Sequence, residues 1–304
     1  PSADKIADVD LSKQGVGIDI SSGEYYTGRL YTPDDFAKGD ISQGNPDDKY
    51  ATFRIVLPLE KGVAYGLSGE TATYAQQVYI DGKLLSEVGK VSDNAEEFVP
   101  ATDRYTLYFT AQADTAEIII RHAWFNHRTG TIQKLCLAKA PLISANERAQ
   151  TVCDGLIAGT LLAMAIFFFG MFLLGNRKRS MMWFSLTCLT AALHYLIYES
   201  KQIGVLFPYL DWYTEHKLEY ITNILYFVFI LLYAFAALGL RPHKRFVVTS
   251  VCSAGAILLF YIFTPSTVYT HFTVVAGAVM AVYLILSSVY ICVTAGKKKR
   301  FGVN

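Results

Sequence analysis

Long apolar runs without Asp, Glu, Lys or Arg dominate the second half of the chain, and they constrain its fold more than any other feature. They lie at about residues 156–174, 181–198, 221–240, 246–264 and 272–295. At a rise of about 1.5 Å per residue, helices of this length reach across a hydrocarbon core of about 30 Å. Only helices and closed barrels satisfy their backbone hydrogen bonds in lipid, so all these runs are predicted to be membrane-spanning helices.

The charges between the apolar runs predict their orientation. The connections 176–180, 241–245 and 296–300 together hold ten Lys and Arg residues, whereas the opposite connections 199–220 and 265–271 hold two. Basic connections stay on the cytoplasmic side of a cell membrane. We therefore expect a multi-pass protein of the cytoplasmic membrane, with its N-terminal half outside the cell and its C-terminus in the cytoplasm.

The first half of the chain has a different character. Residues 1–148 carry 21 acidic and 15 basic side chains, whereas residues 149–304 carry 5 and 12. Short segments of alternating or β-branched residues recur in this half between turn signals. They are residues 15–20, 51–57, 63–67, 77–80, 105–109, 116–121 and 131–137. This pattern predicts two domains: an all-β jelly-roll sandwich outside the membrane at 1–148, and a helical transmembrane domain at 149–304.

Local signals add detail to the predicted sandwich. Asp81-Gly82 between two apolar segments predicts a tight hairpin. Segments 33–50 and 89–102 are rich in turn-forming residues and are interpreted as loops. Residues 141–152 are interpreted as a connector to the first membrane helix.

Cysteine usage limits how the outer domain is stabilised. Four of the five cysteines lie in or beside the apolar runs, and only Cys136 belongs to the β-rich half. An exported domain with one cysteine has no internal disulfide framework, so its stability has to come from a packed core.

The chain opens on Pro1 without an initiator Met or an apolar leader, which we interpret as the start of a mature or trimmed chain.

Aromatic, amide and basic side chains cluster near the end of the β-rich half: Arg121, His122, Trp124, Asn126, His127 and Arg128. A carbohydrate site needs an aromatic face for the sugar ring and planar hydrogen-bonding groups for its hydroxyls. We predict that Trp124, Asn126, His127 and Arg128 bind a small ligand. The alternative is that Trp124 fills the sandwich core while its polar neighbours hold a turn. A metal site is not favoured, because residues 122 and 127 would face opposite sides of a strand and no carboxylate completes a ligand set.

Ionisable residues inside a membrane are functional candidates, since they are costly to bury there. Glu219 lies near the outer end of a predicted helix, and His194 lies about one turn deeper in another. We predict that Glu219 or His194 couples the outer domain to helix packing; the alternative is that such groups at the interface are only solvated. Small residues at 276–278 and 281 permit close helix contact, either within one bundle or in a homodimer.

No catalytic arrangement, phosphate-binding glycine loop or basic nucleic-acid stripe is recognisable. The sequence therefore predicts no enzymatic activity, cofactor, metal or nucleic-acid partner for this chain.

Several short stretches of sequence together resemble a known arrangement. In the β-rich half they are Ala75-Gln76-Gln77-Val78-Tyr79-Ile80-Asp81-Gly82, Val88-Gly89-Lys90-Val91 and Ala123-Trp124-Phe125-Asn126-His127-Arg128-Thr129-Gly130. In the apolar half they are Asp154-Gly155-Leu156-Ile157-Ala158-Gly159, Arg177-Lys178-Arg179-Ser180 and Leu206-Phe207-Pro208. With the domain order and the hydropathy, they resemble the bacterial seven-transmembrane receptors with diverse intracellular signalling modules, whose outer domain is a galactose-binding-type jelly roll.

The resemblance implies seven helices and a cytoplasmic signalling module, such as a histidine kinase, a cyclic-dinucleotide synthase, a phosphatase or a DNA-binding domain. Five helices are predicted here, so the chain resembles a receptor that lacks its last two helices and its output module. Thr131 is a second departure, because relatives tend to have a glycine there.

These observations lead to three functional hypotheses. The first is a signal-transduction receptor whose outer sandwich senses a small ligand, a carbohydrate by preference, and signals through the helices to a cytoplasmic module or kinase. The second is a transporter or channel, which would need polar residues or broken helices near the middle of the membrane. The third is a passive membrane anchor whose outer domain serves adhesion or assembly.

Overall fold

The computed structural model describes residues 16–18, 23–127, 130, 135–175, 177–240 and 244–300. The chain divides into two compact units, Pro1–Thr151 and Val152–Asn304. Each unit is described by itself below.

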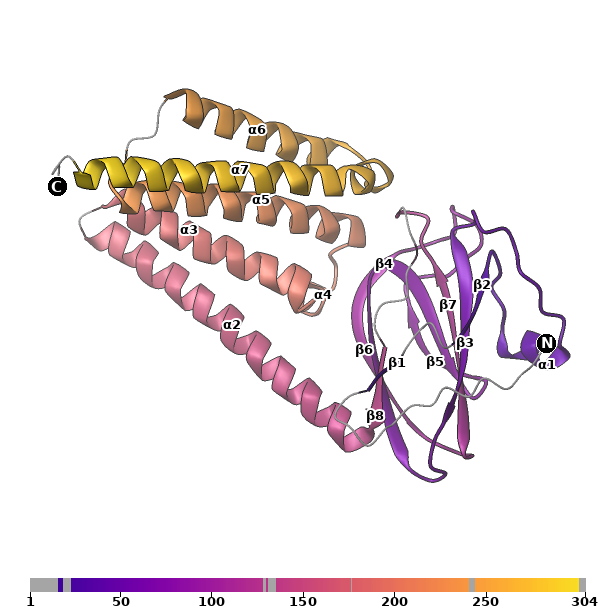
Figure 1. The fold of residues 1–304 in the computed structure, drawn as a ribbon. Helices are drawn as coiled ribbons and strands as arrows, with labels where there is room; N and C mark the ends of the chain where they lie inside the picture. The colour runs from indigo at the N-terminus through magenta and orange to yellow at the C-terminus, as the bar shows by residue number, and fades with distance from the viewer. Residues whose placement is uncertain are drawn as a thin grey trace. The chain divides into compact units, whose positions relative to one another are not determined.

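The N-terminal unit is a curled antiparallel β-sheet sandwich (Figure 1). Its strands are β1 (Val16–Ile18), β2 (Glu24–Thr27), β3 (Tyr50–Pro58), β4 (Ala64–Ile80), β5 (Lys83–Val88), β6 (Ala101–Thr110), β7 (Thr115–Ala123) and β8 (Leu135–Lys139). The spatial order is β1-β8-β4-β7-β3-β2, and β5 and β6 also pair with β4. The sequence prediction of an all-β sandwich followed by helices is confirmed.

Strand β4 differs from its prediction and organises the sandwich. The sequence predicted separate strands at 63–67 and 77–80, whereas one strand of 17 residues covers both. The first half of β4 pairs with β6 and β8, and its second half pairs with β5 and β7. The register shifts between Thr71 and Tyr74, where the strand passes from one sheet to the other. A bulge of this kind bends a strand sharply, which allows one strand to serve both sheets.

The core lies between the two sheets and follows the alternation of the strands. Phe53, Leu67, Ile118, Ile120 and Leu137 are fully buried there, and they come from four different strands. Fully burying such side chains stabilises a fold by about 1.5–3 kcal/mol each. This core explains how the N-terminal unit is stable with a single cysteine.

Two local features complete the unit. The predicted hairpin joins β4 to β5, and Asp81 and Gly82 both have positive φ angles, as a type I′ turn requires. The segment predicted as loop at 33–50 contains a short helix, α1 (Pro33–Lys38). Thr32 and Asp35 cap its first turn reciprocally, and Gly39 ends it with a left-handed conformation.

The helices are α2 (Ala140–Leu174), α3 (Arg179–His194), a π-helical turn η2 (Tyr195–Glu199), α4 (Ile203–Leu206), α5 (Trp212–Ala237), α6 (Lys244–Phe263) and α7 (Ser266–Arg300). Helix α2 begins directly after β8, so the predicted connector at 141–152 is helical. Its first turns belong to the N-terminal unit: Ile143 packs against Gly66 of β4, and the Tyr108 hydroxyl donates to Glu147 at 2.6 Å.

Four described helical segments are long and apolar enough to cross a membrane: Ala140–Leu174, Arg179–Glu199, Trp212–Ala237 and Ser266–Gly296. The fifth predicted span falls in α6, whose described apolar part, Val247–Phe263, is shorter. At about 1.5 Å per residue it covers roughly 26 Å, slightly less than a typical hydrocarbon core. The chain is therefore a multi-pass membrane protein.

Candidate functional site

Trp124, the centre of the predicted ligand site, lies in the interior of the sandwich. It follows the last residue of β7, and its backbone N–H donates to the carbonyl of Lys49 at 2.8 Å. The side chain is 6% exposed. The His122 imidazole stacks on one face of the indole, with ring centroids 4.8 Å apart. The Gly130 backbone lies so close to the indole that a Cβ atom there would overlap the ring. Trp124 therefore offers no open ring face in this conformation.

His122 is a buried titratable group in the same cluster. It is 1% exposed, and its Nε2 atom shares a hydrogen bond with the Tyr25 hydroxyl at 2.8 Å. Its Nδ1 atom is buried and has no hydrogen-bond partner. Burial lowers the pKa of His122 from 6.5 to about 3, because the charged imidazolium would lose its hydration. The imidazole is therefore neutral at physiological pH.

The other predicted ligand contacts have different positions. Asn126 is 4% exposed, and His127 is half-buried with its ring roughly perpendicular to the Tyr74 ring. Arg128 and Thr131 lie outside the described residues. A ligand-binding role for Trp124, Asn126, His127 and Arg128 therefore stays a prediction. In the described part of the chain no three His, Cys, Asp or Glu side chains gather as a metal site would require.

A second polar group lies on the outer face of β4 and β7. Gln77 and Arg121 are direct cross-strand partners, and the Arg121 guanidinium donates to the Gln77 side-chain oxygen at 2.7 Å. It also reaches the Tyr79 hydroxyl at 3.5 Å. The Nε atom of Arg121 is buried and lacks a hydrogen-bond partner. We call Gln77, Tyr79 and Arg121 the outer-face triad.

Aromatic side chains lie on the same sheet face, next to α1. Tyr26, Tyr31 and Phe36 contact one another edge to face, with ring centroids 5.5–5.7 Å apart. The Arg54 guanidinium lies 4.9 Å from the centre of the Phe36 ring. Arg54 also pairs with Glu117 at 2.7 Å and Glu24 at 3.2 Å, which fixes its position. The face thus combines aromatic rings with planar hydrogen-bonding groups.

Electrostatics connect α1 to the outer-face triad. Hydrogen bonds from Thr32 lower the pKa of Asp35, and the positive charges of Lys38 and Arg121 add smaller contributions in the same direction. The sequence prediction missed this face. Its signal was available in the alternation of β4, which places Gln77 and Tyr79 on one side, and in the Thr32-Asp35 capping box.

Of the two predicted coupling residues, His194 contacts a neighbouring helix and Glu219 contacts a residue of its own helix. His194, at the end of α3, is 3.3 Å from the Thr222 hydroxyl of α5. Glu219 of α5 lies 3.3 Å from His216 on the same helix. The Tyr195 hydroxyl, in the π-helical turn, donates to Asp154 of α2 at 2.7 Å. Polar contacts therefore join α2, α3 and α5, beside a π-helical turn of the kind that is frequent at functional sites.

The two units define a class of protein: a folded β-sandwich joined to a bundle of membrane-spanning helices. Residues 150–302 match the family described as 7TM diverse intracellular signalling, and the chain belongs to this family. The family predicted from the sequence is thereby confirmed. The comparison with curated proteins gave no match.

Among solved structures, the chain is similar to a family 35 carbohydrate-binding module from Clostridium thermocellum. The two share 11% sequence identity, and the alignment covers 42% of this chain and all of the module, with a TM-score of 0.26.

Proposed function

We propose that the protein is the sensing part of a membrane receptor rather than an enzyme. Its β-sandwich binds a small polyhydroxylated ligand, a carbohydrate, outside the cell. Its helices pass the signal to a cytoplasmic module or kinase. Membership of a signalling family supports the general role. The positive charges between the helices support the orientation, with the N-terminal unit outside and the C-terminus in the cytoplasm.

The observation that carries the ligand proposal is the outer-face triad beside Tyr26, Tyr31 and Phe36. Sugar hydroxyls both donate and accept hydrogen bonds, and guanidinium, amide and phenol groups match them. Arg121 is partly exposed, and its guanidinium has more N–H donors than the Gln77 and Tyr79 oxygens accept. Ligand hydroxyls would accept hydrogen bonds from the remaining donors, and the aromatic rings would contact the apolar face of a sugar.

The ligand contacts predicted from the sequence are a less favoured site in this proposal than the outer-face triad. Trp124, Asn126, His127 and Arg128 remain candidate ligand contacts at the end of β7. For Trp124 to contact a sugar ring, the Gly130 backbone has to move away from the indole.

Arg121→Met is expected to weaken glycan binding by the full chain at least tenfold, because it removes a charge-assisted donor from the triad. A glycan array probed with the detergent-solubilised protein would select the ligand, and isothermal titration would give the affinities. Arg104→Met is the matched control, since Arg104 is a partly exposed arginine paired with Glu70 away from the triad. A wild-type protein that binds no glycan, or equal affinities for the wild type and Arg121→Met, would contradict the proposal.

Transmission through the helices is also part of the proposal. A ligand biases a bundle only through different affinities for its two packings. Helix α2 continues from β8 into its membrane-spanning part, and polar contacts of Asp154 and His194 link α2, α3 and α5. These contacts are the proposed route, with Glu219 supporting α5.

His194→Leu is expected to leave ligand affinity unchanged within about twofold, because His194 belongs to the helical unit. It should abolish the ligand-induced change in hydrogen exchange of residues 212–237, because the contact to Thr222 is lost. Hydrogen-exchange mass spectrometry of the full chain, with and without ligand, measures both α5 and the sandwich. A ligand response in α5 that persists in His194→Leu would exclude this route.

A further inference from the structure

A cavity between α5, α6 and α7 has no role in the proposed receptor mechanism. It consists of two adjoining parts, of about 280 Å³ and about 80 Å³, which share Phe227, Met280 and Leu284 in their walls. We call the two parts together the bundle cavity. Its walls extend along α5 from Tyr220 to Phe235, about 22 Å at the rise of an α-helix. The cavity is therefore long and narrow, and it runs along the helices.

The larger part of the bundle cavity has a polar end. The Tyr220 and Thr273 hydroxyls lie 3.3 Å apart, and the Tyr261 ring stacks on Tyr220 with centroids 4.5 Å apart. Asn223 lines the same part and lies near the start of the apolar run 221–240. Among the described residues, no hydrogen bond joins the Asn223 side chain to another group. A partly buried amide in a mainly apolar wall is costly without partners, so the cavity is suited to a ligand that supplies them.

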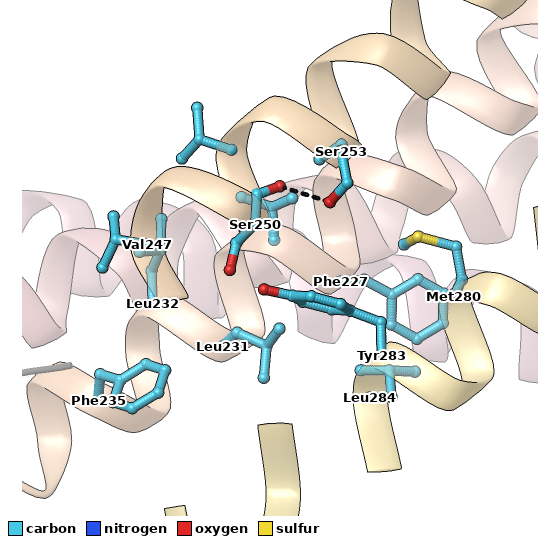
Figure 2. Close-up of a pocket in the computed structure, with 13 residues that line it drawn as sticks. Phe227, Leu231, Leu232, Phe235, Val247, Ser250, Ser253, Met280, Tyr283 and Leu284 are labelled. Atoms are coloured by element: carbon cyan, nitrogen blue, oxygen red, sulfur yellow. Dashed lines mark hydrogen bonds between the residues drawn. The ribbon is translucent and has the colours of Figure 1, made fainter. Parts of the chain in front are cut away.

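The smaller part is almost wholly apolar. Leu231, Leu232 and Phe235 of α5 face Val247 of α6 and Leu284 of α7 around it (Figure 2). Figure 2 also shows the Tyr283 hydroxyl turned toward Ser250, while the Ser253 hydroxyl donates to the Ser250 carbonyl at 3.1 Å. The polarity of the bundle cavity thus falls from the Asn223 end to the Phe235 end.

The cavity opens to the surface of the helical unit beside a glycine. Gly277 of α7 lines the larger part and is exposed, and a Cβ atom built on it meets nothing within 4 Å. Ala276 and Ala281 line the same part of the cavity. These residues are among the small residues at 276–278 and 281 from which a close helix contact was predicted. At Gly277 the absence of a side chain instead forms an entrance to the cavity.

We propose that the bundle cavity binds a single-chain amphiphile from the membrane, with an uncharged head group that carries a hydroxyl or a carbonyl. The head lies at Asn223, where the amide both donates and accepts. The alkyl chain extends past Phe227 to Leu231 and Leu284. None of the described wall residues carries a positive charge to pair with a phosphate, and the narrow cavity has room for one chain, so a two-chain phospholipid does not fit.

The test uses the full chain in phosphatidylcholine nanodiscs and a dodecanol probe that carries a photoreactive diazirine in its chain. Mass spectrometry then maps and quantifies the labelled peptides. We expect saturable labelling of α5, α6 and α7. The matched probe, the same alkane without the hydroxyl, should label these helices about tenfold less, because the Asn223 amide then stays unpaired.

Three variants complete the experiment. Asn223→Leu should lower labelling by the alcohol about tenfold and leave labelling by the alkane unchanged or higher. Gly277→Leu fills the entrance and should lower labelling by both probes. Gly170→Leu is the control, because Gly170 of α2 also has open space around its Cβ position but lies outside the cavity walls. Thermal melting checks that each variant is folded.

Labelling that does not saturate, that is equal for the alcohol and the alkane, or that Gly277→Leu leaves unchanged would overturn the proposal. If Asn223→Leu does not fold, the two probes and Gly277→Leu decide the question without it. None of these results depends on whether the outer sandwich binds a carbohydrate.

Discussion

Gly89→Ala is expected to destabilise the N-terminal sandwich by at least about 3 kcal/mol, a large part of the stability of a domain of this size. Gly89 has a φ angle of +70°, which alanine adopts only with strain. A Cβ atom at this position would also overlap the carbonyl oxygen of Val99. That oxygen is fixed, because Val99 exchanges two backbone hydrogen bonds with Lys90, at 2.8 and 3.2 Å. The overlap can be relieved only by moving the backbone.

Gly62→Ala separates the two causes of this loss. Gly62 has a similar φ angle of +80°, but a Cβ atom there meets nothing within 4 Å. Its substitution should therefore cost only the conformational strain, about 1–2 kcal/mol. Urea unfolding of the full chain, followed by Trp124 fluorescence in a Trp183→Phe, Trp212→Phe background, measures both variants. Equal losses for Gly89→Ala and Gly62→Ala would show that the overlap with Val99 does not matter.

The sequence predicted the membrane half well because lipid imposes a simple rule on it. A charge-free run of sufficient length has few alternatives to a spanning helix. The ends of the helices were less predictable. Helix α5 begins at Trp212, nine residues before the predicted start, because Asp211 caps it and the polar first turns lie outside the apolar run. Hydropathy does not register helical turns of this kind.

The sandwich was predictable as a class but not in its connections. Alternation within each strand identified β3 and β7, whose apolar side chains face the core. It could not reveal that residues 64–80 form one strand, because the passage between sheets at Thr71 depends on partners far along the chain. Cross-strand register is a tertiary property of the same kind. It brings Gln77 next to Arg121, 44 residues away, and so creates the outer-face triad.

The environment of Trp124 could not be decided from the sequence at all. Both an open aromatic platform and a core side chain are consistent with a tryptophan at the end of a strand. The outcome depends on how close the Gly130 backbone comes to the indole and on the rotamer that stacks His122 against it. Neither leaves a periodic signal in the sequence.

Acidification from pH 6.5 to 4.5 is expected to lower the free energy of unfolding of the sandwich by about 2 kcal/mol through His122 alone. The folded protein holds the pKa of His122 at about 3, because burial excludes water, whereas the unfolded chain has the ordinary value of 6.5. Between about pH 3 and pH 6.5, His122 is protonated in the unfolded chain but stays neutral in the folded protein. The stability contributed by neutral His122 is therefore complete above pH 6.5 and is progressively lost as the pH falls toward 3.

His122→Gln isolates this effect from the carboxylates, which titrate in both proteins. Glutamine keeps an oxygen that can accept from the Tyr25 hydroxyl, but it does not titrate, so stability should change about 2 kcal/mol less between pH 6.5 and 4.5 than in the wild type. Tyr25→Phe is the complementary variant: it removes the hydrogen bond of 2.8 Å yet keeps a buried imidazole, so the full pH dependence should remain. Urea unfolding at constant ionic strength measures all three proteins. The same loss of stability in the wild type and His122→Gln would mean that His122 is already protonated, or is reached by water, in the folded sandwich.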